Sequence, residues 1–221
     1  MTSASRKAQL ALLAVPLLWL LPALLHPMGD PYEGIADEID QWIFVHVAQL
    51  ALVPFLAAGV WLLLSGLRST AALIARAALI VWMVFFSAFD AIAGISTGVL
   101  ARHAHSLTGD DQAGAIGAID FLFNESQLAG GGFSALGNIG HFSWVVVAIA
   151  ATVALYRAGS SRLAVGAMLV SVLFAAHAGP PVAAGLVGLF VAELLTFRKR
   201  SAQASAGPAP TAELEGSLRS A

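Results

Sequence analysis

Six long runs of apolar residues, separated by short polar or charged segments, dominate this sequence. A helix needs about 20 mostly apolar residues to cross the hydrocarbon core of a bilayer, whereas the strands of a membrane barrel alternate apolar and polar residues over about 10 positions. The unbroken runs therefore predict an all-α, polytopic membrane protein, a six-helix transmembrane bundle in which residues 1–200 form a single domain. The predicted spans are residues 8–25, 42–64, 71–100, 138–156, 163–178 and 182–197.

The first run and the last two runs each allow more than one prediction for the number of spans. The run at 8–25 follows Arg6 and Lys7, as in a signal peptide. We expect it to be retained, because no clean small-residue cleavage site precedes His26; its removal would leave five spans. The runs at 163–178 and 182–197 each give only about 24 Å of helix, so they form two short spans or a re-entrant hairpin. Residues 201–221, rich in Ala, Ser, Pro and Gly, are predicted to be a disordered cytoplasmic tail.

Composition supports a membrane protein and excludes several other classes. Of the 221 residues, 58% are hydrophobic and 11% are charged, compared with about 25% charged residues in a typical soluble domain. The net charge of −2 gives no strong overall attraction to nucleic acid. We therefore expect the lipid bilayer to be a partner and expect no binding to nucleic acid. Because cysteine is absent, disulfides and thiolate metal sites are excluded.

The basic residues predict the orientation of the chain. Ten of the eleven Lys and Arg residues fall at one set of span ends or in the tail, and Arg102 alone falls at the other set. Because Lys and Arg accumulate in cytoplasmic connections, both termini are predicted to be cytoplasmic in a cell-membrane protein. The outer connections at 26–41 and 101–137 are acidic, either simply to keep these loops solvated or to form a vestibule that attracts cations.

Polar residues of several spans fall near the same depth as one another. All six histidines lie at or beyond the outer ends of the spans, and Asp90 lies about 15 Å inside its span by helical rise. Ionisable residues inside a membrane face the bundle interior and mark sites or pathways. His46 with Gln49, and Asn138 with His141, share helix faces at a spacing of three residues. We therefore expect these polar faces to converge on one outward-facing pocket.

The chemistry of that pocket favours a metal or a haem. Neutral imidazoles suit zinc, copper or iron, and a carboxylate can complete the ligand set. The predicted metal ligands are His46, Asp90, His141 and His177. In an alternative arrangement His46 and His141, on facing helices, ligate the iron of a single b-type haem.

Three functions fit these residues. The favoured one is binding or transport of a metal ion, haem or small ligand at the outward-facing His/Asp pocket. The second is a metal-dependent intramembrane hydrolase that activates water on the same metal. The third is a structural membrane subunit without a site, in which polar side chains only hold helices together. Ligand identity and enzymatic activity are not determined by the sequence.

The remaining polar residues and glycines carry weaker expectations. His26 precedes Pro27 and is expected to be a plain loop residue, and His103 and His105 are expected to be solvated. Glu193 is expected to pair with the basic cluster at 198–200. Gly94 and Gly98 form a G-x-x-x-G pattern, which predicts close helix packing and a face for a second copy or a membrane partner. The residues 112–123 predict an interfacial helix.

Overall fold

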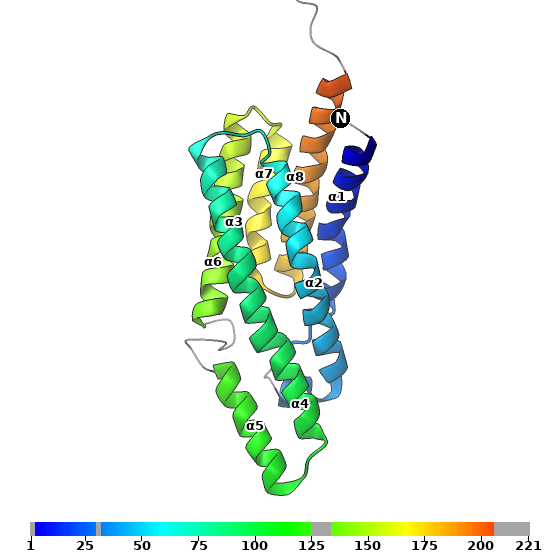
Figure 1. Cartoon of the computed structure of the whole chain (residues 1–221), viewed down its shortest axis with the longest axis vertical. Coiled ribbons are helices and arrows are strands. Elements are labelled where there is room, and N and C mark those ends of the chain that lie inside the picture. Colours follow the sequence, from blue (N-terminus) through cyan, green and yellow to red (C-terminus); the bar gives the residue numbers. More distant parts are fainter. Residues whose placement is uncertain (1–2, 30–31, 125–133, 206–221) are drawn as a thin grey trace, which may run out of the picture.

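The computed structural model describes residues 3–29, 32–124 and 134–205, and within them the secondary structure is helical throughout. Figure 1 shows the helices standing side by side, with α4 and α5 extending beyond the others at one end. The elements are α1 (Ser3–Leu24), η1 (Glu33–Glu38), α2 (Ile39–Leu63), α3 (Thr70–Phe89), η2 (Asp90–Ser96), α4 (Thr97–His105), α5 (Gly109–Asn124), α6 (Ala135–Arg157), α7 (Arg162–Val170), η4 (Ser171–Ala176) and α8 (Pro180–Ser205).

In the described part of the chain, five helices are long and apolar enough to cross a membrane. They cover Lys7–Leu24, Glu33–Leu63, Thr70–His105, Ala135–Arg157 and Pro180–Gln203. The fifth predicted run differs, because it forms the nine residues of α7 followed by the short 3-10 helix η4. The prediction of an all-helical chain is confirmed, with five candidate spans and one shorter apolar helix, Arg162–Ala176. Helix α8 reaches Ser205, so it includes the first residues of the predicted tail, whereas 206–221 lie outside the described residues.

Serine residues define where three of the helices begin. The side chains of Ser69, Ser134 and Ser161 accept hydrogen bonds from the backbone N–H groups three residues later, at 3.2, 2.9 and 3.2 Å. Each satisfies an N–H group that has no partner within the helix, which favours a helix start at the following residue. These caps set the beginnings of α3, α6 and α7.

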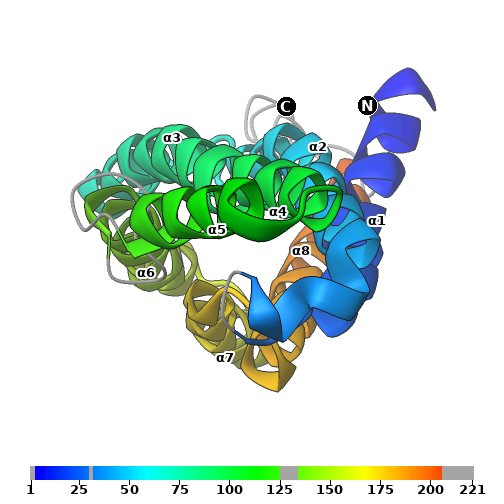
Figure 2. The same ribbon diagram turned by 90° about the horizontal axis from the view of Figure 1, so that it is seen from below.

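Six segments form a closed ring around the molecular axis. Each contacts the next in the order α1, α2, α3, α6, α7, α8, and α8 contacts α1 again. Figure 2 shows this ring from the end at which α4 and α5 project. Within it, a cluster of aromatic side chains joins α1, α3, α6 and η4; its members are Trp19, Trp82, Phe86, Trp144 and Phe174. The Nε1–H of Trp144 donates to the carbonyl of Ser171 at 2.7 Å, which holds η4 against α6.

The third span is longer than a membrane requires. Residues Thr70–His105 form 36 continuous helical residues, roughly 50 Å compared with a hydrocarbon core of about 30 Å. Its last part, α4, packs against α5, where Ile119 is buried with Ala101 and Ala104. The helix expected at 112–123 is therefore present, but it runs alongside α4 and away from the ring. Burial of its apolar face on α4 explains this orientation.

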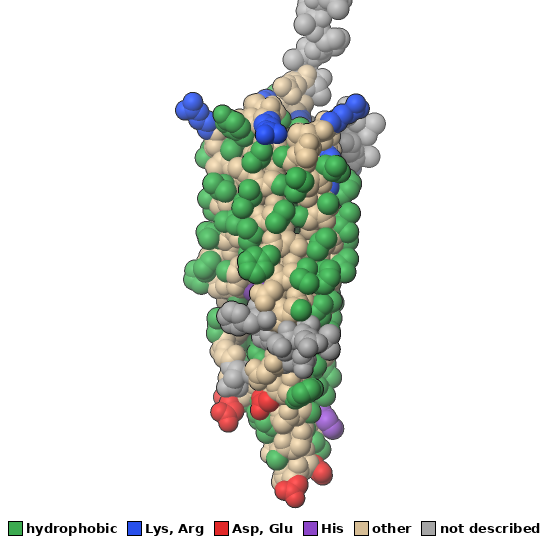
Figure 3. Space-filling view, turned by 90° about the vertical axis from the view of Figure 1, so that its left-hand side faces the viewer, with side chains coloured by type: hydrophobic (Ala, Val, Ile, Leu, Met, Phe, Trp, Pro, Cys, Tyr) green, Lys and Arg blue, Asp and Glu red, His purple; other side chains and the backbone are tan. Residues whose placement is uncertain are grey.

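The charged side chains are segregated along the molecule. In Figure 3, Lys and Arg gather at one end, Asp and Glu gather at the other, and apolar side chains cover the surface between them. The start of α1 and the end of α8 both lie at the basic end (Figure 1). Arg76 lies in α3, and its guanidinium donates to the carbonyls of Leu64 and Leu67 in the α2–α3 turn. This charge separation agrees with the pattern seen along the sequence.

The two glycines of the G-x-x-x-G pattern are occupied within the chain. A Cβ on Gly94 would lie 2.1 Å from Cδ2 of His46, and one on Gly98 would lie 2.6 Å from Cγ1 of Ile43. Both glycines are buried. The pattern therefore marks close packing between the third span and α2 of the same molecule.

Candidate metal-binding site

Three histidines from three separate segments meet near the acidic end of the ring. His26 follows α1, His46 lies in α2, and His177 lies in the turn between η4 and α8. One ring nitrogen from each lies within 4.8 Å of the other two. The ring centroids are 4.9 Å apart for His26–His46, 5.1 Å for His26–His177 and 6.2 Å for His46–His177. We call these three residues the histidine site.

Backbone carbonyls orient two of the three rings. Nδ1–H of His26 donates to the carbonyl of Pro27, and Nδ1–H of His46 donates to the carbonyl of Trp42, both at 2.7 Å. A carbonyl can only accept, so in each ring the proton sits on Nδ1 and Nε2 keeps its lone pair. Histidines that bind metals commonly use one nitrogen for the metal and donate the other to a carbonyl or carboxylate. The two rings are therefore held in the tautomer that a metal requires.

The backbone at His177 is strained. Its φ of 69° is the one positive value at a non-glycine residue in the described part of the chain. A left-handed conformation of this kind costs about 1–3 kcal/mol and persists only where the surrounding structure imposes it. The turn continues through Gly179, with φ 79°, into the Pro180–Pro181 start of α8. This turn places the imidazole of His177 inside the ring, where its Nδ1 is buried without a hydrogen-bond partner among the described residues.

Burial favours the neutral form of the two histidines outside the spans, His26 and His177. It lowers the pKa of His26, and hydrogen bonds to the backbone oppose this effect only in part. Burial also lowers the pKa of His177 well below its ordinary value, and the neighbouring imidazoles of His26, His141 and His46 lower it further. Neutral imidazole is the form that binds metals.

The four predicted metal ligands divide into two groups. His46 and His177 belong to the histidine site, and His141 of α6 lies beside it, with its ring centroid 5.5 Å from that of His177. Nε2 of His141 is buried without a partner in the described part of the chain. Asp90 is fully buried at the start of η2, but it neither belongs to the histidine site nor lines its cavity. Of the four predicted ligands, His46 and His177 therefore line the cavity, His141 lies beside it, and the carboxylate of Asp90 lies outside it.

His26 is the member that the sequence interpretation missed. The expectation of a plain loop residue is corrected, because the chain turns back after α1 and places this ring 5.3 Å from that of Trp42 and against His46. Its neighbour Pro27 suggested a loop, and a loop is indeed present, but it brings the ring of His26 against His46 and His177. The available signal was its shared location with the other five histidines at the outer ends of the spans.

The cavity at the histidine site is small. Its volume is about 230 Å³, below the about 300–1,000 Å³ of pockets that hold drug-sized ligands. Besides the histidines its wall includes Trp42, Phe89 and Phe123. The ring of His177 packs against both His46 and His141, so a porphyrin ligated by that pair would have to displace it. The space suits an ion with a small ligand better than a haem.

The histidine spacing is close to that of a tetrahedral metal site. Zinc–nitrogen bonds of about 2.0–2.1 Å place tetrahedral ligand atoms about 3.3 Å apart. The nitrogens lie within 4.8 Å of one another, so side-chain rotations that bring them closer by up to roughly 1.5 Å complete the geometry. Three protein ligands leave the fourth position open, as in catalytic zinc sites.

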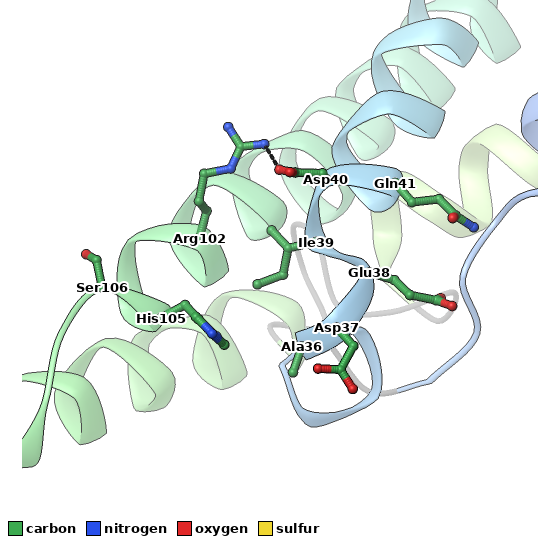
Figure 4. A pocket seen from close by; sticks show the side chains of 9 residues that line it. All are labelled: Ala36, Asp37, Glu38, Ile39, Asp40, Gln41, Arg102, His105 and Ser106. Atoms are coloured by element: carbon green, nitrogen blue, oxygen red, sulfur yellow. Dashed lines mark hydrogen bonds and ion pairs between the residues drawn. The ribbon is translucent and has the colours of Figure 1, made fainter.

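A second, larger cavity lies at the acidic end of the molecule. It has a volume of about 520 Å³, lies between α4 and the start of α2, and shares no lining residue with the histidine cavity. Figure 4 shows Asp40 paired with Arg102 on one side, while Asp37 and Glu38 point away from this pair. The pair is exposed, so it contributes little stability. His103 and His105 are also exposed, as expected of solvated residues.

Glu193 lies inside the ring and not with the basic residues. It is 1% exposed, and its Oε1 atom lies 2.7 Å from the position that a Cβ on Gly59 would take. Its Oε2 atom is buried and has no partner within the described ranges. The expected pairing with residues 198–200 is therefore not observed there; Arg200 instead donates to carbonyls at the end of α2.

Comparison of the chain with models of known protein families, with characterised proteins and with solved structures finds no match.

Proposed function

We propose that this protein is an integral protein of the cell membrane, with both termini in the cytoplasm. Support comes from five helices of spanning length and from the apolar surface between a basic and an acidic end (Figure 3). The basic end belongs in the cytoplasm by the distribution of Lys and Arg. In this orientation the ring of six helical segments is the membrane domain, with Arg162–Ala176 as its shortest member, and the histidine site opens towards the outside.

We infer that the protein binds a divalent transition-metal ion at His26, His46 and His177. The observation that carries this proposal is the convergence of three imidazole nitrogens from distant segments to within 4.8 Å of one another. Uncharged nitrogen ligands suit zinc or copper, whereas calcium and magnesium require oxygen ligands. Three separate chain segments have to be ordered to create this convergence, which favours a ligand that binds them together.

The hydrogen bonding argues against a purely structural role. Polar residues that hold membrane helices together do so by hydrogen bonds between helices. His26 and His46 instead bond to carbonyls within four residues of themselves. His26 Nε2 and His177 Nδ1 are buried without partners within the described segments. Buried polar atoms are nearly always satisfied, so two unpartnered nitrogens in one cluster of histidines call for a missing ligand.

A second candidate function is hydrolysis by a metal-activated water. The observation that favours it is the ligand number, since three histidines leave one position open beside a cavity lined by Phe89, Phe123 and Met28. A metal at such an open position lowers the pKa of its bound water and generates a nucleophile. This activity would need the same ion, so metal binding is the first property to test.

Zinc binding to the detergent-purified full-length protein tests the proposal. Metals are first removed with a chelator, and zinc is then titrated back. We expect His177→Ala to lower the zinc affinity of the histidine site by more than about 100-fold. Loss of a metal ligand should cost more than loss of a residue that only orients a ligand, which costs about 10–100-fold. His26→Ala and His46→Ala should behave alike. The matched control is His105→Ala, since His105 is exposed. Equal zinc affinity in His177→Ala and the wild type would overturn the proposal.

A further inference from the structure

The contact between α2 and η2 defines which residues of the two helices share a level. Nε1–H of Trp42 donates to the carbonyl of Gly94 at 2.7 Å. One turn further along α2, the ring of His46 occupies the space that a side chain on Gly94 would need. The helices run in opposite directions, so the next turn towards the basic end brings Gln49 of α2 and Asp90 of η2 to neighbouring levels. Gln49 and Asp90 therefore lie one helical turn further from the acidic end than His46 of the histidine site.

Neither side chain, of Asp90 or of Gln49, has a hydrogen-bond partner in the described part of the chain. Asp90 and Gln49 are each 0% exposed. Both carboxylate oxygens of Asp90, and both the oxygen and the nitrogen of the Gln49 amide, are buried and unpartnered. An ionised carboxylate is strongly unfavourable in a buried site unless it is paired or binds a cation. Two fully unsatisfied side chains on contacting helices therefore indicate a shared ligand.

The local backbone also departs from a regular helix at this level. Asp90 begins the seven-residue π-helical segment η2, which interrupts the otherwise continuous third span. Such segments are rare and frequently occur at functional sites. Within η2 the carbonyls of Ala91 and Ile92 accept hydrogen bonds from the hydroxyl groups of Ser96 and Thr97. The carbonyl of Gly94 accepts a hydrogen bond from Nε1–H of Trp42. The backbone of the segment is thus satisfied by neighbours, while the Asp90 carboxyl is not.

The ligand chemistry points to a cation. Asp90 offers two carboxylate oxygens, which supply the negative charge that neutral imidazoles lack, and Gln49 offers one uncharged amide oxygen. Resting on the proposed histidine site, we propose that Asp90 and Gln49 form an inner cation position, one helical turn deeper, which takes a divalent metal ion from the histidines. The carboxylate then attracts the ion inwards, because the outer ligands leave its charge uncompensated.

Zinc stoichiometry of the full-length protein in detergent tests the inner position. We expect equilibrium dialysis with zinc to give two ions for the wild type and one for Asp90→Asn, with the affinity of the remaining ion changed by less than about threefold. Asparagine keeps the shape of aspartate and removes its charge. Gln49→Leu provides a second variant that should weaken the same ion. Both variants are compared with the wild type in circular dichroism and size exclusion to establish folding.

Glu193→Gln is the matched control, because Glu193 is also a buried acid but packs against Gly59, ten residues further along α2; it should bind two ions. If the wild type binds only one zinc ion and His177→Ala loses that ion, the proposal of an inner position is wrong and the proposal of the histidine site is retained. Two ions in Asp90→Asn would place the second ion elsewhere and also overturn it. Zinc binding that His177→Ala does not affect would instead contradict the histidine site itself.

Discussion

The position of the His46 ring depends on Gly94. The absence of a side chain at this point lets the imidazole lie directly against the backbone of η2, with Cδ2 only 2.1 Å from where a Cβ would stand. Carbon atoms cannot approach so closely, so a side chain here forces either the ring or the helix to move. The small residue therefore shapes the site without contacting a ligand.

Gly94→Ala should accordingly weaken zinc binding at the histidine site by at least about 10-fold. Displacing the imidazole of His46 should lower the zinc affinity at least as much as removing a hydrogen-bond partner that orients a metal ligand, which costs about 10–100-fold. The measurement is a zinc titration in competition with a chelator of known affinity. Gly114→Ala is the control, because a Cβ at Gly114 meets no atom within 4 Å. Unchanged zinc affinity in Gly94→Ala, in a folded protein, would show that His46 is not a ligand.

At the scale of elements, the end of α2 is held by a side chain from α8. The guanidinium of Arg200 donates to the carbonyls of Leu62, Leu63 and Ser65 at 2.9, 2.8 and 3.0 Å. The last carbonyls of a helix have no partners within it, and a cation there also interacts favourably with the helix dipole. At the basic end the contact joins α2 to α8, two members of the ring that are separated by α1 in the ring order.

Arg200→Gln should therefore destabilise the protein by about 1.5–3 kcal/mol, the usual contribution of hydrogen bonds to a charged group. We expect the midpoint of thermal unfolding in detergent to fall by several degrees, on the order of 3–10 °C for a chain of this size. Arg198→Gln serves for comparison, because Arg198 is exposed at the same end. If both variants melt at the same temperature, the contact contributes no stability.

At the scale of the whole molecule, charge segregation determines the proposed orientation. The basic end includes the start of α1, the end of α8 and the α6–α7 connection, whereas the acidic end includes η1 and the α4–α5 hairpin. Because the chain has no cysteine, single cysteines introduced at exposed positions report on sidedness without background labelling.

A membrane-impermeant maleimide should label Glu33→Cys in intact cells, and Ala158→Cys only after the membrane is permeabilised. Glu33 lies at the acidic end and Ala158 at the basic end, and both are exposed. The physical reason is that basic connections remain in the cytoplasm. Labelling of Ala158→Cys in intact cells, with Glu33→Cys protected, would reverse the orientation and turn the histidine site towards the cytoplasm.

Much of the fold follows from the sequence because its causes are local. Apolar runs of sufficient length predict helices wherever they occur, and serine caps mark the starts of α3, α6 and α7. The separation of basic and acidic residues also appears along the chain before any packing is known. The exception is the fifth run, where η4 and the strained His177 end the helix early.

The composition of the site was decided by tertiary structure. His26 lies with His46 and His177 because the chain turns back after α1. The spacing of these residues along the sequence does not predict that turn. Asp90 stands one turn away from the histidines because the Gly94–His46 contact sets the register between α2 and η2. The sequence by itself predicted the burial of His46, Gln49 and Asp90, since burial follows from hydrophobic context. Which of them would meet depended on contacts between distant helices, and these form only when the ring closes.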